Sequence, residues 1–225
     1  MRILVRPRTL PSEPHQQALQ TIRVQPARVR VPSRAARVLD FDIENRPLSY
    51  LGSDFTTAEV TAIAWAWTDR PRDVTVRLLG EQPLRAILRE FVAAYNEADM
   101  VTGHYITGHD LPMLNGALVE FGMPVLADKF VIDTKTNFIK TKGISLSQES
   151  LGAMMRLEHS KVQMNQARWR AANRLTRQGL ALVKKRVVGD VQQHVEMLRE
   201  LTAKGYLSAP RKWRTGSSQI APYTP

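Results

Sequence analysis

The sequence predicts an α/β domain built around a mixed β-sheet. Three early segments, 37–44, 60–68 and 73–79, are rich in β-branched, aromatic and alternating apolar residues, which is typical of strands. Further along the chain, helical and strand patterns alternate, which is typical of parallel strands joined by helices. Strands followed by alternating helices and strands indicate a sheet with both antiparallel and parallel pairs.

The next four elements are predicted from apolar periodicity. Leu84, Ile87, Leu88 and Phe91 recur at helical spacing and would form one apolar face. A second apolar stripe at helical spacing lies within 111–122, and short apolar runs that predict strands lie before and after it. The predicted elements are a helix over 83–97, a strand over 99–103, a helix over 111–122 and a strand over 129–133. The sheet is therefore expected to have five strands.

The remainder of the domain is predicted to be helical. Ser145 and Gln148 have the spacing of a capping box, which predicts the start of a helix that ends near Met155. A short helix and a long helix follow, and Gly205 ends the long one. Their predicted ranges are 164–173 and 177–204.

The chain divides into three parts. Residues 1–36 form a basic, proline-rich arm without a helical period, residues 37–206 form the folded domain, and residues 207–225 form a tail. Basic residues outnumber acidic ones by eight to one in 1–37 and by fourteen to four in 155–225. The stretch between them is acidic, which suits a metal site whose surroundings hold a polyanion. A merely basic, soluble surface is the alternative.

The composition narrows the class of protein. The chain has 225 residues, 43% of them hydrophobic, and a formal net charge of +11, which suits one sizeable soluble domain. It has no cysteine, which excludes disulfides and thiolate zinc sites. No signal peptide is recognised, and the longest apolar run, 63–67, is too short to cross a bilayer. We expect a cytoplasmic protein that makes no membrane contact.

The first predicted strand carries the most informative residues. Its apolar side chains, Leu39, Phe41 and Ile43, would point into a core. Asp42 and Glu44 would then share the opposite face, about 7 Å apart. Adjacent carboxylates are costly to bury unless a cation lies between them. A divalent cation is the candidate, and an exposed face with solvated acids is the alternative.

Two further aspartates lie at chemically telling places. Asp110 precedes the second predicted helix, where it can cap the helix, bind a cation or do both. Asp190 lies at the edge of the apolar stripe of the long helix, so its burial requires either a cation or a salt bridge to a residue such as Lys184. With Asp42 and Glu44, they could hold two Mg²⁺ or Mn²⁺ ions about 4 Å apart, as in two-metal phosphoryl transfer.

These residues also match a known family in order. The run Asp42-Ile43-Glu44 resembles the first motif of the DEDD (DnaQ-like) 3′–5′ exonucleases, and it is similar to that of the proofreading domains of family B polymerases. The segment 103–112 resembles the second motif, and Gly189-Asp190-Val191 resembles the third. The compact form is similar to bacteriophage members of the family.

The resemblance implies a ribonuclease H-like fold, with a mixed five-stranded sheet flanked by helices and extra C-terminal helices. It implies a two-metal exonuclease that hydrolyses phosphodiester bonds at the 3′ end of single-stranded DNA, with two Mg²⁺ or Mn²⁺ ions as cofactors. DNA rather than RNA would be the nucleic-acid partner, alongside replication or recombination proteins, in the host cytoplasm if the chain is phage-encoded. The implied catalytic and metal-binding residues are Asp42, Glu44, Asp110 and Asp190.

The chain departs from the family at the general base. The family has a tyrosine four residues before the last aspartate or a histidine five before it, where this sequence has Arg186 and Lys185. Neither cation suits that role at neutral pH. His194, one turn after the aspartate, is the candidate base, and a core histidine with satisfied hydrogen bonds is the alternative. His104, Tyr105 and hydrolysis without a protein base are further options.

Candidate nucleic-acid contacts are Ile43, Tyr105, Trp169 and Lys185. Aromatic rings stack on bases, and cations pair with phosphates. The alternatives are core packing for Trp169 and ordinary solvated charge for Lys185. The same two interpretations, phosphate contact or ordinary solvated charge, apply to Lys161, Arg168, Arg170 and Arg174. Asp133 is predicted to be a structural cap.

Two other functions remain open. An RNA 3′–5′ exonuclease of the same family would use the same chemistry, because no feature of the sequence indicates contact with a 2′-hydroxyl. A non-catalytic nucleic-acid-binding module on a decayed nuclease fold would explain the missing tyrosine or histidine. The retention of all four carboxylates argues against the second option, since a binding protein gains nothing by repelling phosphates there.

Overall fold

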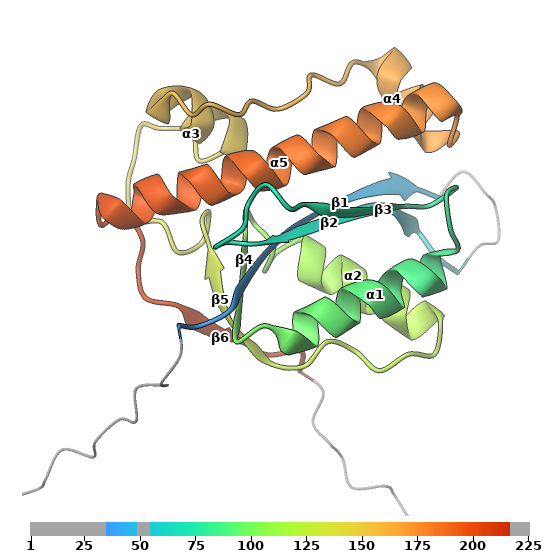
Figure 1. Cartoon of the computed structure of the whole chain (residues 1–225), viewed down its shortest axis with the longest axis horizontal. Coiled ribbons are helices and arrows are strands. Elements are labelled where there is room, and N and C mark those ends of the chain that lie inside the picture. Colours follow the sequence, from blue (N-terminus) through green and yellow to red (C-terminus); the bar gives the residue numbers. More distant parts are fainter. Residues whose placement is uncertain (1–34, 49–54, 217–225) are drawn as a thin grey trace, which may run out of the picture. The chain divides into compact units, whose positions relative to one another are not determined.

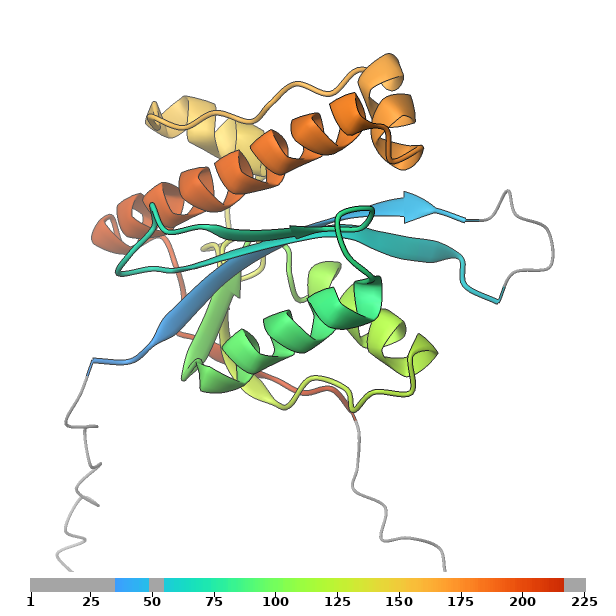
Figure 2. The ribbon, with the colours of Figure 1, turned by 45° about the vertical axis from the view of Figure 1, so that its right-hand side comes forward.

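The domain has three layers, a sheet with helices on both faces. The computed structural model describes residues 35–48 and 55–216, so the predicted arm lies outside the described residues except for positions 35 and 36. The helices are α1 (Leu84–Glu97), α2 (Asp110–Glu120), α3 (Gln148–Met155), α4 (Gln166–Asn173) and α5 (Arg177–Ala203). Helix α5 covers one face of the sheet, α1 and α2 cover the other, and α3 and α4 pack on α5 (Figure 1, Figure 2). The predicted α/β class is confirmed.

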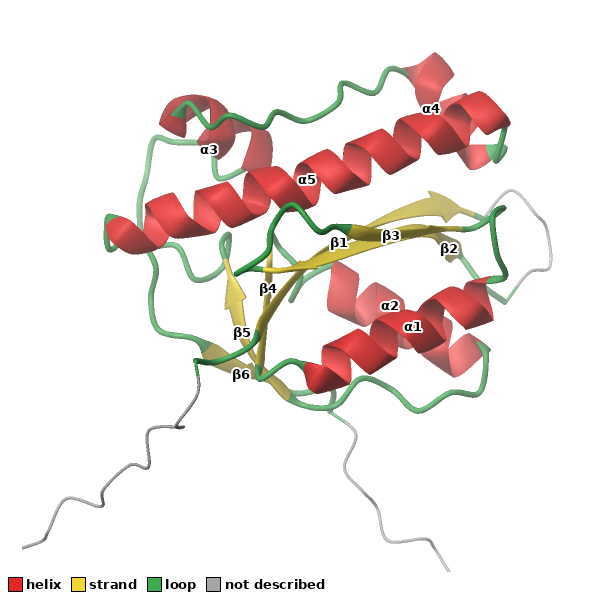
Figure 3. Ribbon diagram, in the orientation of Figure 1, coloured by secondary structure: helices red, strands yellow, loops and turns green. Residues whose placement is uncertain are grey.

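Within residues 35–48 and 55–216, six strands form the sheet: β1 (Val38–Pro47), β2 (Ala58–Trp67), β3 (Thr75–Leu78), β4 (Met100–Gly103), β5 (Lys129–Asp133) and β6 (Arg211–Trp213). Their order is β3-β2-β1-β4-β5-β6 (Figure 3). The three strands β1 to β3 pair antiparallel, whereas β4 pairs parallel with β1 and with β5. The mixed sheet is thus as expected, and β1 lies near its centre.

The sixth strand corrects the predicted number of five. Residues 211–213 were expected in a tail, but they pair antiparallel with β5, with Trp213 opposite Lys129. Trp213 also packs against the main hydrophobic core. A strand of three residues after a proline is too short to show alternation, so only pairing with β5 reveals it.

The start of α3 is a second correction. Ser147, rather than Ser145, caps this helix, and its hydroxyl oxygen accepts a hydrogen bond from the backbone N–H of Ser150 at 3.1 Å. Gln148 is therefore the first helical residue. Instead of closing a capping box, its buried side-chain amide donates to the backbone oxygen of Asp190 at 2.8 Å. The side chain of Gln148 therefore bonds to α5 and not to the N-terminus of its own helix.

The packing of β1 sets which face its acids occupy. Its residues Leu39, Phe41 and Ile43 are buried in the core formed with α1 and α2, where the rings of Phe41 and Phe91 lie 5.1 Å apart. Burying each such side chain stabilises the fold by about 1.5–3 kcal/mol. The alternate residues of β1 consequently face α5. There the alanines of β2, such as Ala64, pack against the valines of α5 and let the helix approach the sheet closely.

Candidate metal centre

Three acids of β1 lie opposite three residues of α5 at matched spacing. Glu44 pairs with Arg186, Asp42 lies beside Asp190, and Asp40 pairs with His194. Two residues of a strand advance about 6.6 Å, and four residues of a helix advance about 6 Å. The two elements run in opposite directions and stay in step over this length. We call the three pairs the three rungs.

Three carboxylates converge around the middle rung. One oxygen from each of Asp42, Glu44 and Asp190 lies within 4.8 Å of the other two. Asp190 is 1% exposed, and its Oδ1 has no hydrogen-bond partner among the described residues. A buried carboxylate oxygen without a partner is costly, and hard divalent cations take oxygen ligands of this kind. The donor set and the unpartnered oxygen therefore fit Mg²⁺ or Mn²⁺.

The electrostatics of the group point the same way. Burial, followed by the charge of Asp190 and of the other nearby carboxylates, raises the pKa of Asp42 well above its usual value. Burial also raises the pKa of Glu44, against the opposing effect of Arg186, and that of Asp190, against Lys161. The carboxylates thus resist ionising together, and a bound cation would relieve their mutual repulsion.

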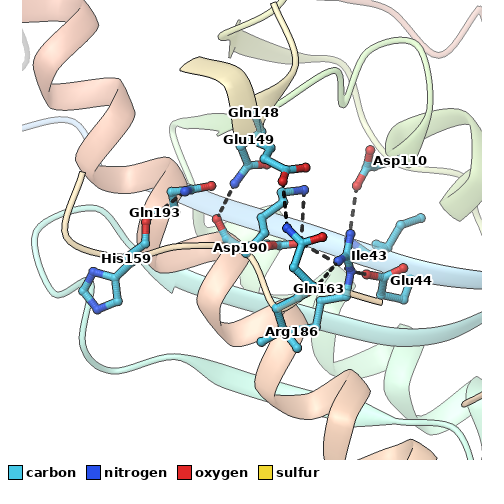
Figure 4. A network of polar contacts seen from close by, with 12 residues as sticks. Ile43, Glu44, Asp110, Gln148, Glu149, His159, Gln163, Arg186, Asp190 and Gln193 are labelled. Carbon is cyan, nitrogen blue, oxygen red and sulfur yellow. Dashed lines mark hydrogen bonds and ion pairs between the residues drawn. The ribbon is translucent and has the colours of Figure 1, made fainter. Parts of the chain in front are cut away.

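Asp110 lies next to this group but is turned toward β1. It is the first residue of α2, which begins one position earlier than predicted, and His109 holds the N-cap position without a side-chain cap bond. Its Oδ1 accepts a hydrogen bond from the backbone N–H of Ile43 at 3.2 Å (Figure 4). Burial raises the pKa of Asp110 to about 7, although that hydrogen bond lowers it. Asp110 is therefore not an N-cap, and it does not belong to the three converging carboxylates.

Two cationic side chains pair with these carboxylates. The Nε of Arg186 lies 2.5 Å from Oε1 of Glu44 and 3.8 Å from Oδ2 of Asp190. The Nζ of Lys161 lies 3.2 Å from the same Oδ2. In the sequence, Arg186 stands where the family that the chain resembles has a tyrosine, and a salt bridge from Asp190 to a neighbouring base was the alternative to a cation. The contact of Arg186 with Asp190, four residues further along α5, is of that local kind. The pairing of Arg186 with Glu44 and that of Lys161 with Asp190 join distant segments and had no local signal.

His194 lies in the core on the third rung. Its Nδ1 pairs with Oδ2 of Asp40, and its Nε2 lies 2.9 Å from Oγ1 of Thr134. The same hydroxyl is 2.9 Å from Nδ1 of His104, whose pKa burial lowers to about 4. Both ring nitrogens of His194 are thus engaged, which is the arrangement of a satisfied core histidine and gives no support for a general base. Asp40 was not predicted as a site residue from the sequence, although its position on β1 places it on the same face of the strand as Asp42.

Asp133 organises the loop that carries Tyr105. Its carboxylate accepts hydrogen bonds from the backbone of Tyr105 and from both the backbone and the hydroxyl of Thr107. Burial raises its pKa, but these bonds outweigh that effect and lower it. Tyr105 has a positive φ of 65°, is 42% exposed, and has Nζ of Lys135 at 3.8 Å from its ring. Asp133 acts as the structural cap that was predicted, and Tyr105 remains available at the surface.

The other predicted nucleic-acid contacts differ in accessibility. Ile43 is 5% exposed, so its side chain belongs to the core. Lys185 is exposed on α5. Trp169 is half-buried on α4, packs against the layer between α5 and the sheet, and lines a surface hollow of about 550 Å³ with Arg170 and Arg174. Trp169 therefore packs as the alternative reading expected, and its stacking on a base stays a prediction.

A second group of metal-type side chains lies outside this centre. Ligand atoms of Glu158, His159 and Glu196 also lie within 4.8 Å of one another. Here the imidazole of His159 pairs with the carboxylate of Glu196, and Gln193 donates to the backbone oxygen of His159 at 2.8 Å. These contacts fasten the segment between α3 and α4, which carries Lys161, onto α5.

Comparisons with known proteins give the fold. No protein-family model and no curated protein matches the sequence. Among solved structures, the chain is similar to the family B DNA polymerase from the hyperthermophilic archaeon Pyrobaculum calidifontis, with a TM-score of 0.54 and 18% identity. The match covers 75% of this chain and 25% of the polymerase chain, so this chain spans about a quarter of that protein's length. None of the helices in the described residues has the length and apolar character needed to cross a membrane. The domain has the α/β, ribonuclease H-like fold that the sequence predicted, with six strands in its mixed sheet.

Proposed function

We propose that this protein is a metal-dependent 3′–5′ exonuclease that hydrolyses phosphodiester bonds at the 3′ end of single-stranded DNA. The observation that carries the proposal is the convergence of Asp42, Glu44 and Asp190, with an unpartnered, buried oxygen on Asp190. The fold is similar to that of a family B DNA polymerase, and the first motif resembles the proofreading domains of such enzymes. The 3′–5′ polarity is taken from the resemblance of the three motifs to the DEDD exonucleases.

The residues take the following roles in the proposal. Asp42, Glu44 and Asp190 hold Mg²⁺ or Mn²⁺, which supplies positive charge at the scissile phosphate. Asp110 binds the N–H of Ile43 and holds α2 against β1 beside the site. Hydrolysis adds water across the bond between phosphorus and the 3′ oxygen. The products are a nucleoside 5′-monophosphate and a strand one nucleotide shorter with a new 3′-hydroxyl. The resemblance implies two metal ions.

Basic and aromatic residues near the carboxylates would hold the strand. The hollow on α4 places the ring of Trp169 beside Arg170 and Arg174, which suits a base stacked on an aromatic ring with phosphates alongside. The exposed ring of Tyr105 with Lys135 offers a similar combination. The proposal includes action in the cytoplasm, in the host cytoplasm if the chain is phage-encoded, together with replication or recombination proteins.

A 5′-labelled oligonucleotide incubated with Mg²⁺ or Mn²⁺ tests the activity. We expect a ladder of shortening products with the wild-type chain and no ladder with Asp42→Ala. Asp73→Ala, which removes an exposed acid away from the site, is the matched control and should leave the ladder intact. Equal degradation of a substrate with a blocked 3′ end would instead indicate an endonuclease. Matched DNA and RNA strands compare the two candidate substrates.

A second candidate function is supported by the cations in the site. Arg186 and Lys161 already pair with the carboxylates, as they would in a nucleic-acid-binding protein whose nuclease site has decayed. Calorimetric titration with Mn²⁺ separates the two. Binding that disappears in Asp190→Ala supports the exonuclease, whereas DNA binding without any Mn²⁺ binding supports the decayed site.

A further inference from the structure

Cationic side chains of the protein partly neutralise the negative charge of the carboxylates in the candidate metal centre. Asp42, Glu44, Asp110 and Asp190 carry four negative charges when ionised. Arg186 and Lys161 contribute two positive charges at contact distance, 2.5 Å from Glu44 and 3.2 Å from Asp190. One divalent cation would complete the balance, and two would leave the centre strongly positive.

Arg186 also occupies the space that a second ion would need. Its Nε lies between Glu44 and Asp190, at 2.5 Å from the first carboxylate and 3.8 Å from the second. An ion bridging Oε1 of Glu44 and Oδ2 of Asp190 would have to displace the guanidinium group, whereas Oδ1 of Asp190 has no hydrogen-bond partner among the described residues and leaves room for one ion beside Asp42. Asp110 cannot easily compensate, since its Oδ1 accepts from the N–H of Ile43.

Both cations are held in place rather than loosely exposed. Arg186 donates through Nη1 to the backbone oxygen of Val162 at 2.8 Å, and its Cζ lies 5.3 Å from the centroid of the Trp169 ring. The side chains of Arg186 and Lys161 are only 17% and 18% exposed. Lys161 belongs to the segment that His159 fastens to α5 through Glu196. Figure 4 shows Arg186 directed from α5 toward Glu44.

We propose that Arg186 and Lys161 take the place of a second divalent cation, so that the centre binds a single Mg²⁺ or Mn²⁺ ion. The inference rests on the metal binding of the proposed function and replaces the two ions that the resemblance implies. A fixed arginine at the position of the family's tyrosine then supplies positive charge beside Glu44, where it can also face the phosphate of a bound strand.

The stoichiometry of Mn²⁺ binding tests the proposal without any activity measurement. Calorimetry, with electron paramagnetic resonance of free Mn²⁺, should give one ion per wild-type chain. Lys161→Gln/Arg186→Gln should bind two ions, and its first ion should bind more than roughly tenfold tighter, since a unit charge about 4 Å away outweighs one order of magnitude in affinity. Lys184→Gln/Lys185→Gln removes the same charge from exposed positions on α5 and should remain at one ion.

The outcomes separate this inference from the proposed function. Two ions in the wild-type chain overturn the inference and leave the exonuclease proposal standing, whereas no ion at all overturns both. A double variant that folds but stays at one ion also overturns the inference. If the double variant fails to fold, anomalous diffraction from wild-type crystals soaked in Mn²⁺ decides, with one peak beside Asp42 expected and two peaks contradicting it.

Discussion

The Nε of Arg186 lies 2.5 Å from Oε1 of Glu44, although the two residues are 142 positions apart in the chain. This contact joins β1 to α5 at one end of the three rungs, and Asp40 with His194 joins them at the other. The middle rung joins two acids, Asp42 and Asp190, and Lys161 from the segment between α3 and α4 pairs with Asp190 at 3.2 Å. Oδ1 of Asp190 still has no partner among the described residues, so this arrangement fits a bound cation.

Stability in the absence of divalent cations should fall as pH rises from about 4 to about 7. Burial raises the pKa of Asp110 from 3.8 to about 7, and it also raises that of Asp42. Between those pH values the folded chain binds more protons than the unfolded chain, so each rise in pH favours unfolding, by a few kcal/mol in total as an order of magnitude. Urea unfolding at several pH values with a chelator measures the slope.

Two controls accompany that measurement. Asp110→Asn should flatten the slope, because its side chain no longer titrates. Asp133 has a lowered pKa, so its contribution to stability rises slightly with pH up to about pH 5 and adds no slope above that value. Added Mn²⁺ should restore stability near pH 7 in the wild-type chain, and a stability that rises toward pH 7 without metal would contradict the prediction.

Removing His194 should expose the cost of burying Asp40. The pair is buried, so His194→Leu leaves an unpaired carboxylate in the core and should destabilise the chain by about 3–5 kcal/mol. Asp40→Leu/His194→Leu should recover most of that loss, because it removes both charges. Denaturant unfolding of the three chains measures the effect.

The same site offers a functional control. His194→Gln can keep a hydrogen bond to Asp40 but cannot act as a base. We expect it to retain DNA hydrolysis per folded molecule, as the geometry gives His194 no contact with the converging carboxylates. Loss of hydrolysis in a fully folded His194→Gln chain would return His194 to the role of base.

Alanine substitution of two glycines in α5 should change the stability of the chain in opposite directions. A Cβ at Gly179 would lie 2.2 Å from the backbone oxygen of Ala171, which cannot move without disturbing α4. Gly179→Ala should therefore destabilise the chain by about 1–3 kcal/mol or more. Gly189→Ala meets only an ordinary contact of 3.7 Å and should stabilise the helix by up to about 1 kcal/mol. Thermal unfolding of both variants gives the comparison.

The arginines beside Trp169 should contribute to the salt dependence of DNA binding. If Arg170 and Arg174 contact phosphates, each glutamine substitution should lower the slope of log affinity against log salt by about 0.7 for a single strand. Fluorescence titration with an oligonucleotide over several salt concentrations measures the slope. Lys204→Gln, at the far end of α5, is the matched control and should leave the slope unchanged. An equal effect of all three substitutions would show a diffuse charge effect instead of local contacts.

Much of the architecture was accessible from periodicity alone. The alternation of Leu39, Phe41 and Ile43 predicted a buried strand with Asp42 and Glu44 on its other face, and the spacing of valines predicted α5. These patterns are local, because strand and helix geometry assigns each side chain to a face within a few residues. The missed strand at Arg211 depends on its pairing with β5, and the predicted capping box is absent because the side chain of Gln148 bonds to the backbone of Asp190.

The sequence by itself determined which acids share a face and in what order the motifs occur. Only the tertiary structure decided that Arg186 meets Glu44, that Lys161 meets Asp190 and that His194 is fully engaged by Asp40. The physical reason is that the register of α5 along β1 depends on how the valines of the helix pack on the alanines of β2, and a slip of one turn would give every acid of β1 a different partner.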